Sequence, residues 1–465
     1  MAGVESHGSA KAERSGGSSF SPSRSLAIIL CLFPVIYCLA IMAYALLNFS
    51  DYGADVPRFL RYIVAPGLIA AAFMLAAVLL PPRKGANVGL AASAVLIALL
   101  IVEFILNVRM VISMVSLASM LGAGPSGSEE IARGRDGIPP TYTSKNLSSE
   151  MEVETLEQAL LGGIPGEEVL LCSQEGAPLY YTADRYGFNN DDAVHDTSLE
   201  IMIVGDSFVE GYCQDRPDTF AGKMRDLRPR TASIGMRGGG PLYELALIGR
   251  YGQEFQPDWV AMAFFAGNDW ENLQREAGTP WLAEALTANP EYGSTRPTSQ
   301  QVELAGRVID ELWAKDISAR DVFAKSSFVR NIVALNQIWG LVGLDYPKVS
   351  HDQPIYGDIL GRAKAMTESW GGKFVLVYIP QEVRYRGWLD KSFLYDDVRS
   401  DVLNAAAAHD VEVVDLTEVF AEADNPSELF ASDGHFSPAG STVAARALNA
   451  RISALENQKA ALASK

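Results

Sequence analysis

The chain has 465 residues, of which 48% are hydrophobic and 20% are charged, so it is long enough for several domains and too apolar for a disordered or fibrous protein. A formal net charge of −18 argues against a nucleic-acid partner, because that affinity comes mostly from Lys and Arg that neutralise phosphates. Only four cysteines are present, without a CxxC pair, which argues against a disulfide scaffold and a structural zinc site. We therefore predict no metal, and no other cofactor is indicated.

Residues 1–24 are rich in Ser, Gly and Ala and are predicted to form a disordered tail. Three apolar runs follow and predict a membrane anchor over residues 25–121, with transmembrane helices at 25–49, 62–80 and 88–106. A span needs about 20 apolar residues, which the first two runs provide outright. The third is interrupted by Glu103. A cleaved signal peptide is the alternative for the first run, but the usual apolar stretch of about 7–15 residues is shorter.

The distribution of Lys and Arg predicts the orientation of these spans, because basic residues gather on the cytoplasmic side. With three spans and the amino terminus inside, the larger basic group lies inside: Lys11, Arg14, Arg24, Arg83 and Lys84. The outer loop then holds Arg58 and Arg61. This predicts a multi-pass membrane protein whose large domain is periplasmic or otherwise extracytoplasmic. If 88–106 does not span, the large domain is cytoplasmic instead.

Residues 122–150 are rich in Pro, Gly and Ser and predict a linker, so the soluble domain is expected over residues 151–465. Short apolar runs within it predict five buried parallel strands: Glu200–Val204, Thr231–Ile234, Trp259–Phe265, Phe374–Ile379 and Val411–Val414. Helical patterns lie between and after them: Phe220–Leu227, Leu242–Tyr251, Gly357–Ser369, Asp396–Ala408 and Ala439–Leu455. This alternation predicts an α/β domain with a parallel sheet covered by helices on both faces. In such sheets the ligand site lies at the carboxyl ends of the strands.

Polar motifs stand at those strand ends. Asp206-Ser207 follows the first strand, a glycine-rich turn at 235–240 follows the second, and Asn268-Asp269 follows the third. Asp433-Gly434-His435 precedes the last helix. A serine, a glycine-rich turn, an asparagine and a late Asp/His pair are the parts of a site that cleaves esters.

In this order, the motifs resemble the four blocks of the SGNH (GDSL-type) hydrolase superfamily over about residues 180–455. The resemblance implies a flavodoxin-like doubly wound parallel sheet, with Ser207 as nucleophile and His435 as base. It also implies an oxyanion hole formed by Ser207, Gly238 and Asn268. The segment at 184–190, DRYGFNN, is similar to the lead-in of membrane-associated bacterial members.

The chemistry of ester cleavage needs these residue types. Serine is a weak nucleophile that loses its proton to a base as it attacks, the role of His435. Asp433 would orient the imidazole and stabilise its protonated form. Backbone N–H groups of Ser207 and Gly238, with the Asn268 amide, would stabilise the oxyanion of the tetrahedral intermediate. The other four histidines stand in the tail or outside any motif: His7, His195, His351 and His409.

Several features depart from the family pattern. Ser432 stands where the family has the acid, so that Gly434 alone separates Asp433 from His435. Ser233 replaces an asparagine at the start of the second block, and Ala266 replaces a glycine in the third. These departures keep open a second hypothesis, a catalytically inactive relative that binds glycans or assists envelope assembly.

Each motif also has a simpler interpretation. Asp206-Ser207 could only cap a helix. The glycine-rich turn could bind a nucleotide, but it lacks the G-x-G-x-x-G spacing, and no Walker A motif occurs in the chain. A helical insertion at about 270–350 is expected to overhang the site, where its tryptophans would stack on sugar rings or, more commonly, lie in the core. Cys172 and Cys213 could form a disulfide in an oxidising compartment.

The sequence therefore predicts a membrane-anchored serine esterase or O-acyltransferase that works through an acyl-enzyme. The resemblance implies acyl groups, commonly acetyl, on cell-envelope carbohydrate as the substrate class. The expected partners are an acylated small molecule or polysaccharide, the lipid bilayer and the machinery that makes envelope polysaccharide.

Overall fold

The computed structural model describes residues 23–53, 56–121, 140–174, 177–287, 289–313, 328–343, 353–386 and 391–463. The predicted tail lies outside these residues except for its last two, and so does most of the predicted linker, 122–139. The chain divides into two compact units. One contains Met1–Ile105 with Arg330–Asn336, and the other contains Leu106–Val329 with Gln337–Lys465.

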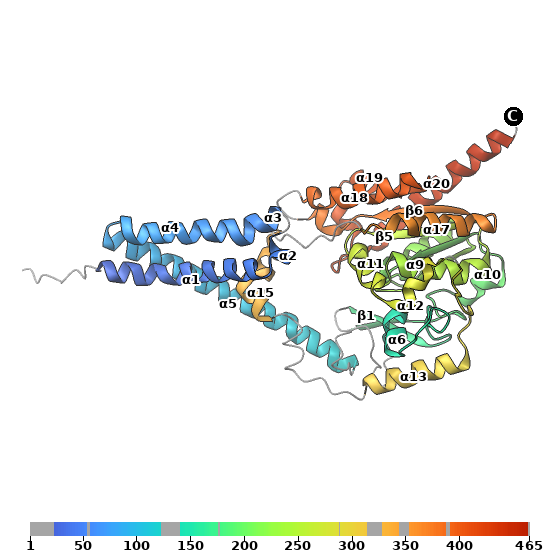
Figure 1. Cartoon of the computed structure of the whole chain (residues 1–465), viewed down its shortest axis with the longest axis horizontal. Helices are drawn as coiled ribbons and strands as arrows, with labels where there is room; N and C mark the ends of the chain where they lie inside the picture. The colour runs from blue at the N-terminus through green and yellow to red at the C-terminus, as the bar shows by residue number, and fades with distance from the viewer. Residues whose placement is uncertain are drawn as a thin grey trace, which may run out of the picture. The chain divides into compact units, whose positions relative to one another are not determined.

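Three helical segments are long and apolar enough to cross a membrane, as the sequence predicted. They are Arg24–Leu47 (α1), Val56–Leu79 (α3 Val56–Phe59, η1 Leu60–Val64 and α4 Ala65–Leu79) and Pro82–Arg109, which is the first part of α5 (Pro82–Leu121). Figure 1 shows α1 and α4 side by side. The Arg24 guanidinium donates to the carbonyl of Ala77 at 3.1 Å and to that of Leu80, so the start of α1 and the end of α4 lie at the same end of the pair.

Small residues allow α5 to approach α1 closely. Gly85, Gly89 and Ser93 are spaced four apart and therefore lie on one face of α5. A Cβ atom at Gly89 would lie 2.7 Å from the carbonyl carbon of Leu30, and the Ser93 hydroxyl donates to the Leu30 carbonyl at 3.1 Å. Close contact between small residues is the usual basis of helix packing in membranes, where the hydrophobic effect gives no advantage to helix association.

The second unit is built on a five-stranded parallel sheet in the order β4–β3–β5–β6–β7. The strands are β3 (Ile201–Gly205), β4 (Thr231–Gly235), β5 (Trp259–Phe265), β6 (Lys373–Ile379) and β7 (Glu412–Asp415). All five lie within one residue of the predicted strands. The order and the parallel direction confirm the predicted flavodoxin-like doubly wound α/β class.

Alternate side chains of the strands enter two separate cores, as expected for a sheet buried on both faces. On one face Met202 and Val204 of β3 pack with residues of α9 (Pro241–Leu247), α17 (Tyr356–Ser369) and α18 (Ser392–Ala408). On the other face Ile201 and Ile203 pack with residues of α8 (Phe220–Leu227), α19 (Leu416–Ala421) and α20 (Pro438–Ala463). The layers are visible in Figure 1.

The other short elements of the chain are α2 (Phe49–Tyr52), η2 (Asp192–Asp196), α7 (Ser207–Glu210), η3 (Arg216–Asp218), η4 (Ile248–Gly252), α10 (Gln253–Phe255), η5 (Glu284–Leu286), α16 (Asn336–Leu341), η6 (Glu382–Tyr385) and η7 (Pro426–Leu429).

A third core lies beside the sheet, and the sequence analysis did not predict it. It joins an antiparallel hairpin, β1 (Glu168–Gln174) and β2 (Ala177–Thr182), with α6 (Ser144–Glu150) and α13 (Ser299–Trp313). Its buried residues include Tyr142, Leu147, Leu171, Tyr181 and Ile309.

This core corrects the predicted start of the domain at residue 151, because residues 140–150 are already part of it. Leu170 N–H donates to the Pro140 carbonyl at 2.7 Å, and Ile164 N–H donates to the Tyr142 hydroxyl at 2.8 Å. The segment resembles a linker in composition because its few apolar side chains are separated by Ser, Thr and Pro. Burial of Tyr142 and Leu147 nevertheless anchors it.

Different parts of the predicted insertion at 270–350 belong to different parts of the structure. Trp270 in α11 (Asp269–Ala277) and Trp281 in α12 (Pro280–Ala283) are only 2% and 4% exposed, which makes them core residues and not a sugar-stacking surface. Residues 330–336, which include most of α15 (Phe328–Ala334), belong to the unit of apolar helices, where the Tyr37 hydroxyl donates to the Val333 carbonyl at 2.7 Å. The expectation that the insertion forms a wall over the site stays a prediction. Residues 314–327 and 344–352 lie outside the described residues.

Candidate active site

The strand order places a topological switch point at the carboxyl end of the sheet, between β3 and β5. The connection after β3 leads to β4, on one side of β3, whereas the connection after β5 leads to β6, on the opposite side of β5. The two connections therefore run in opposite directions along the sheet. Such a switch point is where doubly wound sheets bind their ligands. Ser207 directly follows the loop after β3, and Asn268 follows β5.

Ser207 is held at the start of α7. The Asp206 carboxylate caps this short helix by accepting from Phe208 N–H at 3.0 Å, so the helix-cap interpretation of Asp206 is correct. The cap does not compete with a role for Ser207, because its hydroxyl points to a different partner. Ser207 Oγ lies 2.8 Å from His435 Nε2 across a sequence separation of 228 residues. The structure thus brings the predicted nucleophile and base within hydrogen-bond distance.

His435 lies in a tight loop before α20. Gly434 N–H donates to the Ala431 carbonyl at 3.0 Å, and Ala431 N–H donates to the His435 carbonyl at 2.7 Å. Gly434 has φ of +87°, and a Cβ atom there would meet nothing within 4 Å. Glycine is therefore favoured for its backbone conformation and not for space, which agrees with the bend predicted at this position.

Two aromatic rings hold the His435 imidazole. The Phe208 ring lies 5.0 Å from it and the Tyr212 ring 4.6 Å from it, measured between centroids, with interplanar angles of 41° and 40°. Both come from the nucleophile helix or the residues that follow it, so the turn that presents Ser207 also positions its base. The sequence analysis missed these two residues, although both lie within five positions of Ser207.

Asp433 lies beside His435 but at a long distance for a hydrogen bond. Its Oδ1 atom is 3.5 Å from His435 Nδ1 and accepts from His435 backbone N–H at 3.1 Å. Burial tends to raise the pKa of Asp433, but its interactions with His435 outweigh this and hold the pKa below its usual value. Among the described residues Nδ1 has no hydrogen-bond partner, and Ser432, at the position of the family's acid, is exposed.

The glycine-rich turn after β4 is bound to the neighbouring loop. Met236 N–H donates to the Gly205 carbonyl at 3.1 Å, and Gly238 has φ of +73°, a conformation that favours glycine. Arg237 between them donates its backbone N–H to Glu210 Oε2 at 2.8 Å, and its guanidinium pairs with Glu210 Oε1 at 2.9 Å. Gly238 and Asn268 thus follow the two strands that flank β3.

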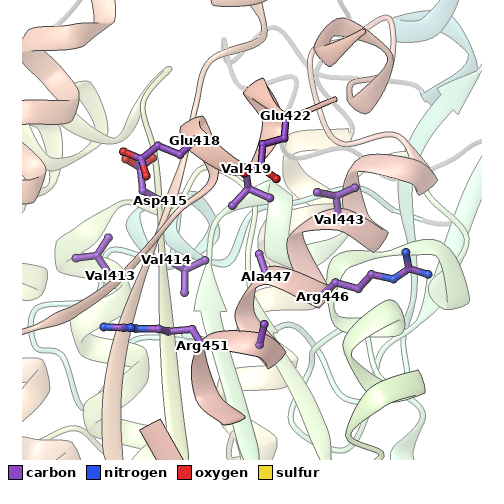
Figure 2. A pocket seen from close by; sticks show the side chains of 11 residues that line it. Val413, Val414, Asp415, Glu418, Val419, Glu422, Val443, Arg446, Ala447 and Arg451 are labelled. Carbon is purple, nitrogen blue, oxygen red and sulfur yellow. The ribbon is translucent and has the colours of Figure 1, made fainter. Parts of the chain in front are cut away.

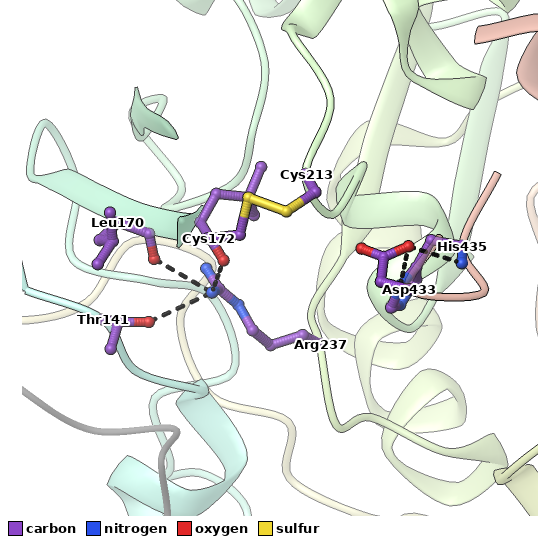
Figure 3. The surroundings of a disulfide bond; sticks show 8 residues. Thr141, Leu170, Cys172, Cys213, Arg237, Asp433 and His435 are labelled. Atoms are coloured by element: carbon purple, nitrogen blue, oxygen red, sulfur yellow. Dashed lines mark hydrogen bonds and ion pairs between the residues drawn. A yellow bond between two sulfur atoms is a disulfide. The ribbon is translucent and has the colours of Figure 1, made fainter. Parts of the chain in front are cut away.

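The Arg237 guanidinium also reaches the hairpin (Figure 3). It donates to the carbonyls of Leu170 and Leu171 at 3.1 and 2.9 Å. Burial tends to lower its pKa, but the charge of Glu210, the hydrogen bond to Glu210 and the nearby Tyr181 and Tyr212 together raise it, so Arg237 stays charged. A disulfide between Cys172 and Cys213, with Cα atoms 5.5 Å apart, joins β1 to the loop after α7 and confirms the predicted pair.

The DRYGFNN segment forms a turn that is hydrogen-bonded to β4. Asp184 Oδ1 accepts from the N–H groups of Tyr186 and Phe188 at 2.8 and 2.9 Å, which closes the turn. Asn190 pairs with both backbone groups of Ser233 at 2.8 Å and so docks the segment on β4. His195 is buried against Asp184, with Nε2 to Oδ2 at 2.8 Å, a partnership that the sequence did not reveal.

Three carboxyl groups, Asp206, Glu244 and Asp269, form a buried acid cluster next to the site. Each is at most 2% exposed, and among the described residues both oxygens of Glu244 lack a hydrogen-bond partner. Burial, together with the charges of the other two carboxyls, raises the pKa of Glu244 well above its usual value. Burial likewise raises the pKa of Asp269 well above its usual value and that of Asp206 to about 6.

A cavity of about 570 Å³ lies elsewhere, between β7, α19 and α20 (Figure 2). Its apolar residues include Val414, Val419 and Val443, and its charged residues include Glu422 and Arg446. None of the predicted site residues lines it.

No protein-family model and no curated protein matches the chain. Among solved structures, the chain is similar to one described as a lipolytic protein of the G-D-S-L family from Desulfitobacterium hafniense DCB-2. The likeness covers 53% of this chain and 96% of that one, at 13% identity and a TM-score of 0.28. A likeness this weak carries no argument about activity, and the fold class rests on the strand order above.

The acid cluster predicts that stability falls as the pH rises. Below pH about 4 the carboxyls are protonated in both states; above it they ionise in the unfolded chain, while the folded state keeps its protons until its raised pKa is passed. Glu244→Gln should therefore melt at a higher temperature than the parent at pH 8, with a smaller difference at pH 5. Thermal melting of the full chain in detergent measures this.

Glu303→Gln, at an exposed position of α13, is the matched control and should leave the melting temperature unchanged at both pH values. A Glu244→Gln protein that is less stable than the parent at pH 8 would show that the carboxylate is favourably paired.

Proposed function

We propose that the chain is a membrane-anchored serine esterase or O-acyltransferase that works through an acyl-enzyme. The single observation that carries this is the 2.8 Å contact between Ser207 Oγ and His435 Nε2 at the switch point of the sheet. The two residues are 228 positions apart in the sequence, and Ser207, at the start of α7, is 9% exposed. A nucleophile and a base require that geometry.

The residues suggest the following sequence of steps. Ser207 Oγ attacks the ester carbonyl while its proton passes to His435 Nε2. The Ser207 and Gly238 N–H groups and the Asn268 amide stabilise the resulting oxyanion. The intermediate then collapses, the alcohol leaves with the proton from His435, and the acyl group stays on Ser207. Water in a hydrolase, or a sugar hydroxyl in a transferase, then attacks the acyl carbonyl while it gives its proton to His435. The bond to Ser207 Oγ breaks as His435 returns this proton to Oγ, which releases the acyl group and restores the free serine.

The substrate class is the part of the proposal that rests on the family resemblance. We propose acyl groups, commonly acetyl, on cell-envelope carbohydrate, in cooperation with envelope-polysaccharide machinery. The long contact between Asp433 and His435 favours keeping a second candidate, an inactive glycan-binding protein with the same fold, because an active triad usually has a shorter contact.

We also propose that the catalytic domain is extracytoplasmic. The positive-inside rule places Arg24, Arg83 and Lys84 in the cytoplasm. The contact of Arg24 with the end of α4 supports this grouping, because Arg83 and Lys84 begin the next helix directly after that end. The disulfide also suits an oxidising compartment.

The nucleophile is tested with a fluorophosphonate probe and an acetyl ester. Wild-type protein in detergent should form an adduct at Ser207, located by mass spectrometry of its peptides. Ser207→Ala should lose the adduct and lower kcat by at least about 10⁴-fold, because the attacking atom is gone. Ser432→Ala, at an exposed position in the His435 loop, should keep both activities. An unlabelled wild-type protein would favour the inactive glycan-binding candidate.

The role of Asp433 is tested by Asp433→Asn. If the carboxylate orients the imidazole when substrate is bound, kcat should fall by up to about 10⁴-fold with little change in KM, as expected for loss of the correct tautomer. Kinetics across pH 5–9 with the same acetyl ester provide the measurement. Near wild-type turnover in Asp433→Asn, beside an inactive His435→Ala, would show a Ser–His dyad.

The orientation is tested with reporters fused after Lys465. A reporter that works only outside the cytoplasm, such as a phosphatase that needs disulfides, should be active there, because three spans carry the chain across. Activity of a cytoplasm-only reporter at the same position would show that the segment 88–106 does not span and that the proposed orientation is reversed.

A further inference from the structure

The turn that carries Gly238 cannot keep its shape by itself. The turn contains three consecutive glycines, Gly238 to Gly240, and glycine has more backbone freedom than any other residue type. The only contact within the turn that the described residues show is Gly239 N–H to the Met236 carbonyl at 3.0 Å. An oxyanion donor is effective only if its N–H direction is set before the reaction. Groups outside the turn must therefore hold it.

Three such groups contact successive residues of the turn. Glu210 fixes its start by accepting from Arg237 N–H at 2.8 Å. Asn272 on α11 donates its side-chain amide to the Gly239 carbonyl at 3.0 Å. Between them, the Lys145 ammonium on α6 donates to the carbonyl of Gly238 itself. Lys145 thus holds the same residue whose N–H is the proposed oxyanion donor.

Lys145 is itself rigidly placed. Its ammonium pairs with Glu276 at 2.9 Å, where the side chains are 14% and 1% exposed. The α6 helix is fixed on both sides of Lys145, because the buried hydroxyls of Ser144 and Ser148 donate to the carbonyls of Gly162 and Leu160 at 2.8 and 3.0 Å. A charged donor on a docked helix is suited to hold a flexible peptide.

Glu276 extends the contact to the helix that follows the turn. Its Oε2 atom accepts from the N–H groups of Leu242 and Tyr243 at 3.1 and 3.2 Å, at the start of α9. Lys145 therefore holds the middle of the turn through the Gly238 carbonyl, and Glu276 holds the first turn of α9, which directly follows it.

We propose that Lys145 is a positioning residue: it holds the carbonyl of the Gly238–Gly239 peptide and so restricts the backbone rotation at Gly238. The Gly238 N–H, which belongs to the preceding peptide, then stays directed at the developing oxyanion. The inference rests on the proposed function, since it needs Gly238 as a donor in that reaction. Lys145 does not touch the substrate. Its loss should therefore weaken stabilisation of the transition state and leave binding of the substrate almost unchanged.

Lys145→Met tests this in the full chain, because it keeps the aliphatic stem and removes the charge and the donor. We expect kcat for an acetyl ester to fall about 10- to 100-fold with KM within about twofold, since one oxyanion donor contributes about 10²–10³ and is here misdirected but still present. The rate of fluorophosphonate labelling at Ser207 should fall in parallel. Lys145→Arg, which keeps a charged donor, should remain closer to wild type in both measurements.

Arg228→Met is the matched control for a merely structural effect. Arg228 is as buried as Lys145, at 13% side-chain exposure, and it pairs with Glu200 and Glu456 at the opposite, amino end of β3. It should lower the melting temperature and leave kcat per labelled active site unchanged.

The outcomes separate the possibilities. Wild-type kcat and labelling in Lys145→Met would overturn the positioning role while the proposed function stands, and so would an equal loss of kcat in Arg228→Met. A wild-type protein that the probe does not label would overturn the proposed function, and the role of Lys145 with it.

Discussion

The buried ion pair between Glu210 and Arg237 joins the helix that begins with Ser207 to the glycine-rich turn of the candidate site. Glu210 ends the short helix that begins with Ser207, and Arg237 immediately precedes Gly238 in the sequence. Their side chains are 0% and 10% exposed, so neither charge can be left without the other. Removing one partner of such a pair is usually destabilising by about 3–5 kcal/mol, because a buried charge remains uncompensated. The relative position of the nucleophile and the glycine-rich turn depends on this contact.

The same pair brings the third core into the site. Glu210 also accepts from the Tyr181 hydroxyl of β2 at 3.0 Å, while Arg237 donates to carbonyls of β1. The disulfide between Cys172 and Cys213 is a second, covalent link between this hairpin and the loop after α7. Residues that precede the sheet by many positions thus support the edge that carries the candidate site. This explains why the segment from Pro140 onward folds with the domain, although its composition is that of a linker.

The site combines rigid support with carboxyl groups that are unfavourable to bury in their charged form. The neighbours in sequence of Ser207 and Asn268, Asp206 and Asp269, belong to a cluster of carboxyls whose pKa values are raised by burial. Functional sites commonly contain ionisable groups with shifted pKa values, and the rest of the fold has to offset the free-energy cost of burying them. Here the two buried cores on the faces of the sheet supply that stability.

Features that depend on local pattern could be predicted from the order of the residues alone. Apolar runs of sufficient length identified three helices able to span a membrane, and short apolar strands with helical patterns between them identified the five strands and the doubly wound class. Ser207 and His435 were recognisable because each stands in a motif after a strand or before a helix, and the structure brings them together; their catalytic roles stay predictions. Other features became visible only in the folded chain: the hairpin, the start of the domain, the grouping of residues 330–336 with the apolar helices, and the contacts of Lys145, Glu210 and Arg237. Each of these depends on partners tens to hundreds of residues away, and neither periodicity nor composition encodes which distant residue a side chain will meet.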